Sequence, residues 1–154
     1  MFDLIIRGDQ VVTPQGTGAW DVCIQGDTIA AIAAPGTFDD SQAGQVIDAR
    51  GKIVIPGGID PHIHSLWHIP PLEEGGEVTW TDGPDVVSRA AIHGGTTTLL
   101  DFASWQQKGT LEEVINVRKQ DWTGNCYTDY GYHVLLQGAI PPELMPQIAE
   151  VIEE

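Results

Sequence analysis

Basic residues are scarce in this chain. It has 7 lysines and arginines against 22 aspartates and glutamates among 154 residues, which gives a formal net charge of -15. So acidic a chain repels phosphate backbones and anionic lipids, whereas it favours solubility and the binding of cations. We therefore expect no nucleic-acid partner and no membrane partner.

Cysteines and long apolar runs are also scarce. Cys23 and Cys126 are the two cysteines, and their separation fits neither a metal motif nor a redox motif. Free thiols suit a reducing compartment, so we expect a cytoplasmic protein. No apolar run approaches the length of a membrane helix, and the N-terminus lacks the basic-then-apolar layout of a signal peptide.

Short apolar runs between turn-forming residues characterise residues 1–52. Runs such as residues 21–25 and 28–32 are separated by Gly-Asp turns, a pattern typical of a small antiparallel sheet or sandwich. Two later runs, residues 45–49 and 52–55, flank a hairpin-like break at Arg50-Gly51. We assign residues 1–52 to an N-terminal β part.

From residue 53 onward, strand-like and helix-like patterns alternate. A strand ending near His64 is followed by a loop over residues 66–83 that is rich in Pro and Gly. Helices are then predicted at 85–92, 111–120 and 143–152, and strands at 96–102 and 130–136. This alternation predicts an α/β fold with parallel strands and right-handed crossovers.

Residues 53–154 thus supply three β/α units, whereas a closed (β/α)8 barrel needs roughly 250 residues. We expect the chain to be the N-terminal piece of a longer protein, with an incomplete barrel. The alternative is a small open α/β domain whose free edge is covered by a partner or by a second copy.

Two histidines separated by one residue end the strand. Residues 56–64 read Pro-Gly-Gly-Ile-Asp-Pro-His-Ile-His. Because side chains alternate along a strand, His62 and His64 should share a face while Ile63 packs behind them. Neutral imidazole is a common ligand for zinc, so the pair predicts half of a metal site.

Several motifs together resemble those of the cyclic amidohydrolases, in particular the hydantoinase and dihydropyrimidinase family. Besides the motif at residues 51–64, the resemblance lies in Asp-Leu-Ile-Ile-Arg-Gly at 3–8 and Gly-Gly-Thr-Thr-Thr at 94–98. It continues with Asp-Phe at 101–102 and Asp-Tyr-Gly-Tyr-His at 129–133. These motifs span nearly the whole chain in the order that the family has them.

The resemblance implies a β-sandwich next to a metal-bearing (β/α)8 barrel. Residues 1–52 would contribute strands to the sandwich, and residues 53–154 would form the first three units of the barrel. It also implies two zinc ions in each active site of the whole protein, with His62 and His64 as ligands. A bridging lysine, two further histidines and a catalytic aspartate would lie beyond residue 154, so no catalytic residue is assigned within the chain.

The implied activity is metal-dependent hydrolysis of a cyclic amide, a hydantoin or a dihydropyrimidine, by a homo-oligomer that is a tetramer in the family. Leu66 and Trp67 would line the substrate as a hydrophobic gate. We expect the chain by itself to be inactive. Two alternatives stay open, namely a non-catalytic dihydropyrimidinase-like scaffold and another cyclic amidohydrolase such as an allantoinase or dihydroorotase.

Four further polar residues lie in or near these motifs, and three of them admit two interpretations each. Asp60 either orients a histidine or is a simple turn residue, and His68 is interpreted as a loop residue of the pocket that is not a ligand. Asp101 either caps the next segment or supports the site. His133 is either a hydrogen-bonded core histidine or a residue of the site.

Overall fold

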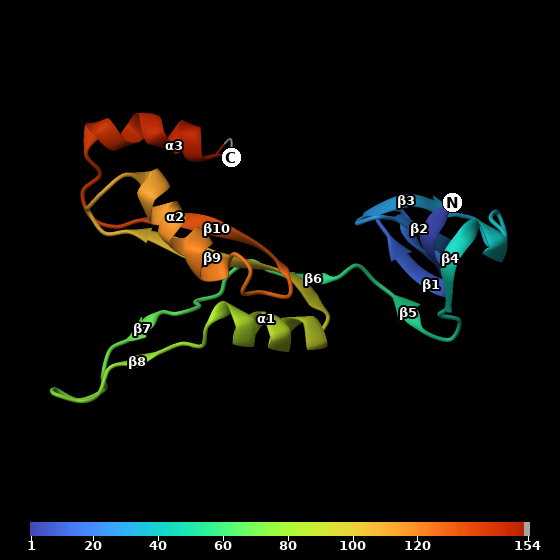
Figure 1. The fold of residues 1–154 in the computed structure, drawn as a ribbon, viewed down its shortest axis with the longest axis horizontal. Coiled ribbons are helices and arrows are strands. Elements are labelled where there is room, and N and C mark those ends of the chain that lie inside the picture. Colours follow the sequence, from blue (N-terminus) through green and yellow to red (C-terminus); the bar gives the residue numbers. More distant parts are fainter. Residues whose placement is uncertain (153–154) are drawn as a thin grey trace. The chain divides into compact units, whose positions relative to one another are not determined.

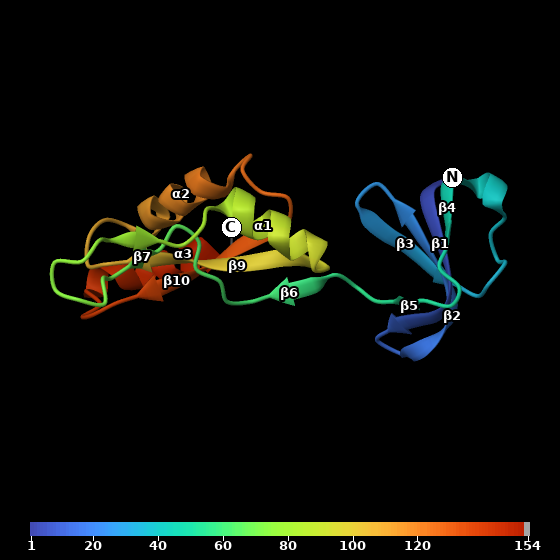
Figure 2. The same cartoon turned by 90° about the horizontal axis from the view of Figure 1, so that it is seen from below.

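A computed structural model describes residues 1–152 of the chain (Figures 1 and 2). The chain divides into two compact units, Met1–Pro56 and Gly57–Glu154. In residues 1–152 the strands form three open sheets and no closed barrel. No helix in this described part is long and apolar enough to cross a membrane.

The first unit is a mixed sheet built around β1 (Phe2–Thr13). β2 (Gly16–Gln25) pairs antiparallel with β1, and β3 (Thr28–Ala33) pairs antiparallel with β2. β4 (Ala43–Asp48) and the short β5 (Ile53–Val54) instead pair parallel with β1. The expected antiparallel sheet is therefore correct for the first three strands and wrong for the last two.

The predicted hairpin-like break at Arg50-Gly51 is also wrong. Because β2 occupies one edge of β1, β4 and β5 share the other edge at successive positions along it. Gly51 has a φ of 77°, and its amide donates to the Asp9 carboxylate at 3.1 Å. Glycine adopts this left-handed conformation without steric cost, so the chain is offset here without being reversed.

Arg7 ties the connection between β3 and β4 to this sheet. Its guanidinium pairs with the buried Asp21 and with Asp40 in the 3-10 helix η1 (Asp40–Gln42). It also donates to the carbonyl oxygen of Phe38 at 2.9 Å. The hydrogen bond that Arg7 donates to Asp40 and the negative charge of Asp21 raise the pKa of Arg7. One cation thus fixes a segment with little regular structure of its own.

The second unit contains a parallel sheet covered by helices. β9 (Thr96–Trp105) lies between β6 (Gly58–Asp60) and β10 (Asp129–Leu136), and both pairings are parallel. α1 (Pro84–His93) and α2 (Leu111–Trp122) are the crossovers, and both pack on β9 from the same side of the sheet (Figure 2). The predicted β/α alternation is confirmed, but the strand expected to end near His64 is shorter, because its regular pairing stops at Asp60.

Two predicted segments differ in detail. The loop over residues 66–83 contains a small antiparallel hairpin of β7 (His68–Ile69) and β8 (Thr79–Trp80). The last predicted helix starts as the 3-10 helix η2 (Pro142–Leu144) and continues as α3 (Met145–Ile152). Glu153 and Glu154 lie outside the described residues.

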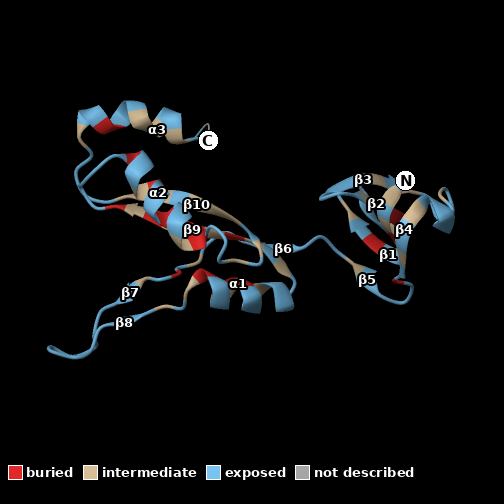
Figure 3. Cartoon of the chain, viewed as in Figure 1, coloured by how far each residue is buried: buried red, intermediate tan, exposed pale blue. Residues whose placement is uncertain are grey.

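Burial alternates along β9 and identifies the face that meets the helices. Leu99, Asp101, Ala103 and Trp105 are buried, whereas the residues between them are half-buried (Figure 3). Three of these four are apolar, as expected for a face under helices. Asp101 is the exception, a carboxylate with 0% exposure in an otherwise apolar row.

A capping box starts α2. The Thr110 hydroxyl accepts a hydrogen bond from the Glu113 amide at 3.1 Å, and the Glu113 carboxylate accepts one from the Thr110 amide at 2.9 Å. The first turn that this box stabilises carries Leu111, which is buried in a core cluster with Trp105 and Leu144. The expected cap at Thr110 is confirmed.

We predict that Thr110→Ala lowers the free energy of unfolding of the second unit by about 1 kcal/mol, because one amide of the first turn loses its acceptor. Glu112→Ala is the matched control, since Glu112 is in the same turn but outside the capping box. Chemical denaturation followed by circular dichroism measures both. Equal effects of the two substitutions would contradict the capping role.

The outer strand β6 predicts association of the chain at high concentration. Its Ile59 is 65% exposed on a strand with one partner among the described residues, a combination that promotes edge-to-edge pairing. We expect sedimentation velocity to show concentration-dependent oligomers that Ile59→Lys reduces. Val117→Lys, at a 61% exposed position of α2, should leave them unchanged. A monomer at all concentrations would contradict the prediction.

Candidate metal centre

The segment that carries the two histidines continues the path of β6 along β9. The Ile63 amide donates to the Leu100 carbonyl at 3.0 Å, so the parallel pairing extends beyond the regular strand. Asp60 accepts a hydrogen bond from the His62 amide at 3.1 Å, which forms a local turn. Of the two interpretations of Asp60, this contact supports the turn residue.

The imidazoles of His62 and His64 lie side by side. Their Nε2 atoms are 3.3 Å apart, and the ring planes are inclined by 88°. The neighbouring placement on one face that the His-x-His spacing predicts is therefore confirmed. Whether the rings bind a metal stays a prediction.

The Nε2 separation suits a metal ion. Two nitrogens bound tetrahedrally to zinc at about 2.0–2.1 Å are separated by about 3.3–3.4 Å. The observed 3.3 Å agrees with that spacing, and it equally lets one ring donate a hydrogen bond to the other. The spacing of the two donors thus fits one zinc ion, for which they would be two of the four ligands of a tetrahedral site.

Phe102 is the common neighbour of the aromatic side chains in this region. Its ring centroid lies 4.6 Å from that of His62, 5.0 Å from that of His64 and 5.1 Å from that of His133. Trp67 also packs on the imidazole of His64, with the two ring centroids 4.3 Å apart. These contacts restrict the two imidazoles between the sheet and the following loop.

His133 supports the same segment from β10. Its Nε2 lies 2.9 Å from the carbonyl oxygen of Pro61, the residue before His62. A carbonyl accepts only, so this nitrogen carries the proton and donates. His133 is therefore a hydrogen-bonded histidine next to the pair. Among the described residues, no group of three or more His, Cys, Asp or Glu could hold a metal.

Leu66 and Trp67 follow Ser65 in the chain and line a recess of about 380 Å³ together with Phe102 and Trp80. Leu66 has a φ of 49°, an unusual conformation for a leucine, and its amide donates to the Asp82 carbonyl at 3.1 Å. His68 lines this recess and packs on Trp80, and it lies in the short strand β7 rather than in the expected loop.

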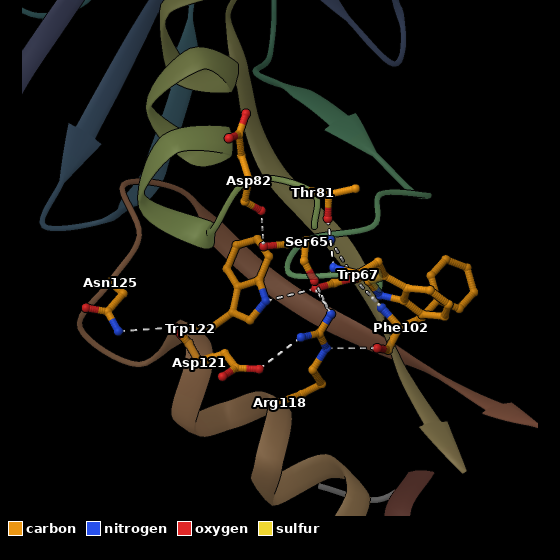
Figure 4. Close-up of polar contacts among 10 residues, drawn as sticks. Ser65, Trp67, Thr81, Asp82, Phe102, Arg118, Asp121, Trp122 and Asn125 are labelled. Atoms are coloured by element: carbon orange, nitrogen blue, oxygen red, sulfur yellow. Dashed lines mark hydrogen bonds and ion pairs between the residues drawn. The ribbon is translucent and has the colours of Figure 1, made fainter. Parts of the chain in front are cut away.

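Arg118 forms a buried ion pair with Asp101, and Figure 4 shows its guanidinium next to Ser65, Phe102 and Asp121. Arg118 from α2 is 3.0 Å from the Asp101 carboxylate, which also accepts from the Trp122 indole at 3.0 Å and from the Ser65 amide at 3.4 Å. Arg118 pairs further with Asp121 at 2.9 Å. Asp101 therefore supports the segment behind the histidines, which is one of its two expected roles.

Sequence reasoning missed Arg118, Trp122 and Ser65. A signal for the first was present, because Leu111, Ile115, Arg118 and Trp122 follow the spacing of one helix face. A charged residue in an otherwise apolar stripe predicts a buried partner. Ser65 carries no such signal, since its contacts depend on residues far away in the sequence.

We predict that Asp101→Asn lowers the free energy of unfolding of the second unit by about 3–5 kcal/mol, because it leaves the buried Arg118 without its main counter-charge. Asp121→Asn removes a partner of the same guanidinium that is 31% exposed, and should cost less than about 1 kcal/mol. Urea unfolding of both variants provides the measurement. Similar losses would contradict the dominant role of Asp101.

Comparisons with known proteins agree on the amidohydrolases. A profile described as "Amidohydrolase family" matches residues 45–120. The D-hydantoinase of Streptomyces coelicolor is 36% identical over 152 residues, which cover 97% of this chain and 31% of that protein. A crystal structure of D-hydantoinase matches with a TM-score of 0.81 at 34% identity, covering 100% of this chain and 31% of that one.

The structure of dihydropyrimidinase from Brevibacillus agri also matches with a TM-score of 0.81, at 32% identity over 100% of this chain and 31% of that one. The chain thus matches the N-terminal third of these structures. It spans about 31% of the length of the relatives described here.

Proposed function

The chain belongs to the hydantoinase and dihydropyrimidinase family, and from this premise we propose that it supplies the first two metal ligands of a hydrolase that opens cyclic amide rings. The observation that carries the proposal is the 3.3 Å separation of the His62 and His64 Nε2 atoms. This pair lies where the strand β6 ends, the position at which barrel enzymes place their functional groups.

The fold forms the start of a larger architecture in this proposal. Residues 53–154 contribute the first three β/α units of a (β/α)8 barrel, and residues 1–52 contribute strands to a β-sandwich. The parallel order β10-β9-β6 with crossover helices supports the first assignment. The mixed sheet of the first unit, which has its own buried core, supports the second.

His62 and His64 would hold one ion of a zinc pair. When bound, the ions would supply an activated water as nucleophile at neutral pH and would polarise the carbonyl of the ring. The chain's own residues orient the imidazoles, through Phe102 and the turn at Asp60, and His133 holds the preceding carbonyl. In this proposal a lysine, two further histidines and an aspartate from the rest of the enzyme would complete the site.

Leu66 and Trp67 would contact the substituent of the cyclic amide. Their recess adjoins the histidine pair, because Trp67 and Phe102 contact both. Its lining by Trp80, Val114 and Val117 favours an apolar substituent. Together with the family of the chain, this makes a hydantoin or dihydropyrimidine ring that carries such a group the proposed substrate.

The net charge and the cysteine content bear on the partners and the compartment of the proposed enzyme. The net charge of -15 opposes nucleic acid and anionic membranes as partners, and free Cys23 and Cys126 suit the cytoplasm. A homo-oligomer, a tetramer as in the family, is the expected assembly. The exposed apolar side chains of the β6 region agree with a surface that other parts of the protein cover.

We predict that the isolated chain binds Zn²⁺ weakly through this pair, and that His62→Ala or His64→Ala abolishes the binding, because one imidazole alone is a poor chelator. His68→Ala is the control, since His68 packs on Trp80 in the adjoining recess. Shifts of the histidine ring signals in NMR spectra during a zinc titration measure the binding. Unchanged binding in both site variants would place the metal elsewhere.

Activity is tested in a chimera that joins this chain to the remaining two thirds of the Streptomyces coelicolor D-hydantoinase. Loss of substrate absorbance is followed with hydantoin, dihydrouracil and allantoin in the presence of zinc or manganese. We expect turnover by the chimera, none by its His62→Ala or His64→Ala variants, and none by the isolated chain. Full activity of either variant would refute the ligand assignment, and turnover confined to allantoin would favour an allantoinase.

A further inference from the structure

Ser65, directly after the histidine pair, is held at each of its polar atoms. The residue is 0% exposed. Its amide donates to Asp101, its hydroxyl donates to the Asp82 carbonyl at 3.1 Å, and its carbonyl accepts from Arg118. These three hydrogen bonds therefore fix the conformation of the backbone that follows His64.

Arg118 reaches this point from α2 and contacts a second backbone group as well. Its Nε donates to the carbonyl of Phe102 at 3.0 Å (Figure 4). The ring of Phe102 contacts both imidazoles of the pair. One guanidinium thus holds the residue that follows the histidines and the residue on which they pack.

The chemistry of this contact requires arginine. A planar guanidinium presents five donors in a rigid fork, whereas a lysine ammonium is a single point charge. Here the donors are divided among the Asp101 and Asp121 carboxylates and the Ser65 and Phe102 carbonyls. Because burying an ion pair costs about as much as the attraction returns, such a pair contributes little net stability compared with apolar packing.

We propose that Arg118 is a positioning residue for His62 and His64. With Asp101 as its counter-ion, it fixes the backbone directly after the pair at Ser65 and the backbone of Phe102, on which both rings pack, so that the two Nε2 atoms converge. Trp122 fixes the carboxylate in turn, through its indole N–H. The role in metal binding rests on the proposed function, but the placement of the rings does not.

The test compares Arg118→Lys and Arg118→Ala with Arg89→Ala in the full 154-residue chain. Arg89 is the control because it is an exposed arginine of the same unit, placed over the Tyr127 ring. Two quantities are measured, namely the nuclear Overhauser effect between the His62 and His64 rings without metal, and the zinc affinity from their NMR signals. The backbone spectrum of each variant reports folding.

We expect Arg118→Lys to stay folded while the effect between the rings weakens and zinc affinity falls about 10- to 100-fold, the range found for residues that orient metal ligands. Arg118→Ala should show the same losses, and millimolar guanidinium should restore part of them. Arg89→Ala should match the wild type. If Arg118→Ala unfolds, the lysine variant alone decides.

The outcomes separate the two claims. A ring contact that depends on Arg118 in a chain that binds no zinc supports positioning and refutes the proposed metal site. Wild-type ring contact and zinc affinity in a folded Arg118→Lys variant refute positioning and leave the metal site intact.

Discussion

The ion pair between Asp101 and Arg118 is the constraint on which the second unit depends. It connects the buried face of β9 to α2, and through Ser65 it connects both to the loop that follows the histidines. Each group of a buried ion pair needs hydrogen-bond partners for all its polar atoms, because a buried charge without a partner costs its full desolvation free energy. The Trp122 indole, the Asp121 carboxylate and two backbone carbonyls are such partners.

The first unit uses a related arrangement for a different purpose. Arg7 joins the buried Asp21 to Asp40 and to a backbone carbonyl, and so holds an irregular connection against the sheet. No histidine occurs in this unit, since all five lie between residues 62 and 133. The same chemistry therefore secures a loop in one unit and supports the candidate site in the other.

The site combines rigid and irregular backbone. The histidines follow a strand of three residues, and a turn at Asp60 and a bond from Ile63 to Leu100 guide the chain onward. Regular pairing alone would not fix the rings there, so their placement depends on contacts from β9, β10 and α2. Phe102 and His133 provide two of these contacts from adjacent strands.

The sequence by itself determined the β/α order and the cap at Thr110, and its His-x-His spacing predicted that the two imidazoles are neighbours. These features depend on periodicity and on residues close together in the chain, where alternation and hydrogen-bonding preference act locally. Its motifs also indicated the family. Only the tertiary structure decided that β4 and β5 run parallel to β1, because which edge of a strand is free depends on the other strands. It alone also decided that Arg118 holds Ser65, 53 positions earlier, since a buried charge finds its partners through packing.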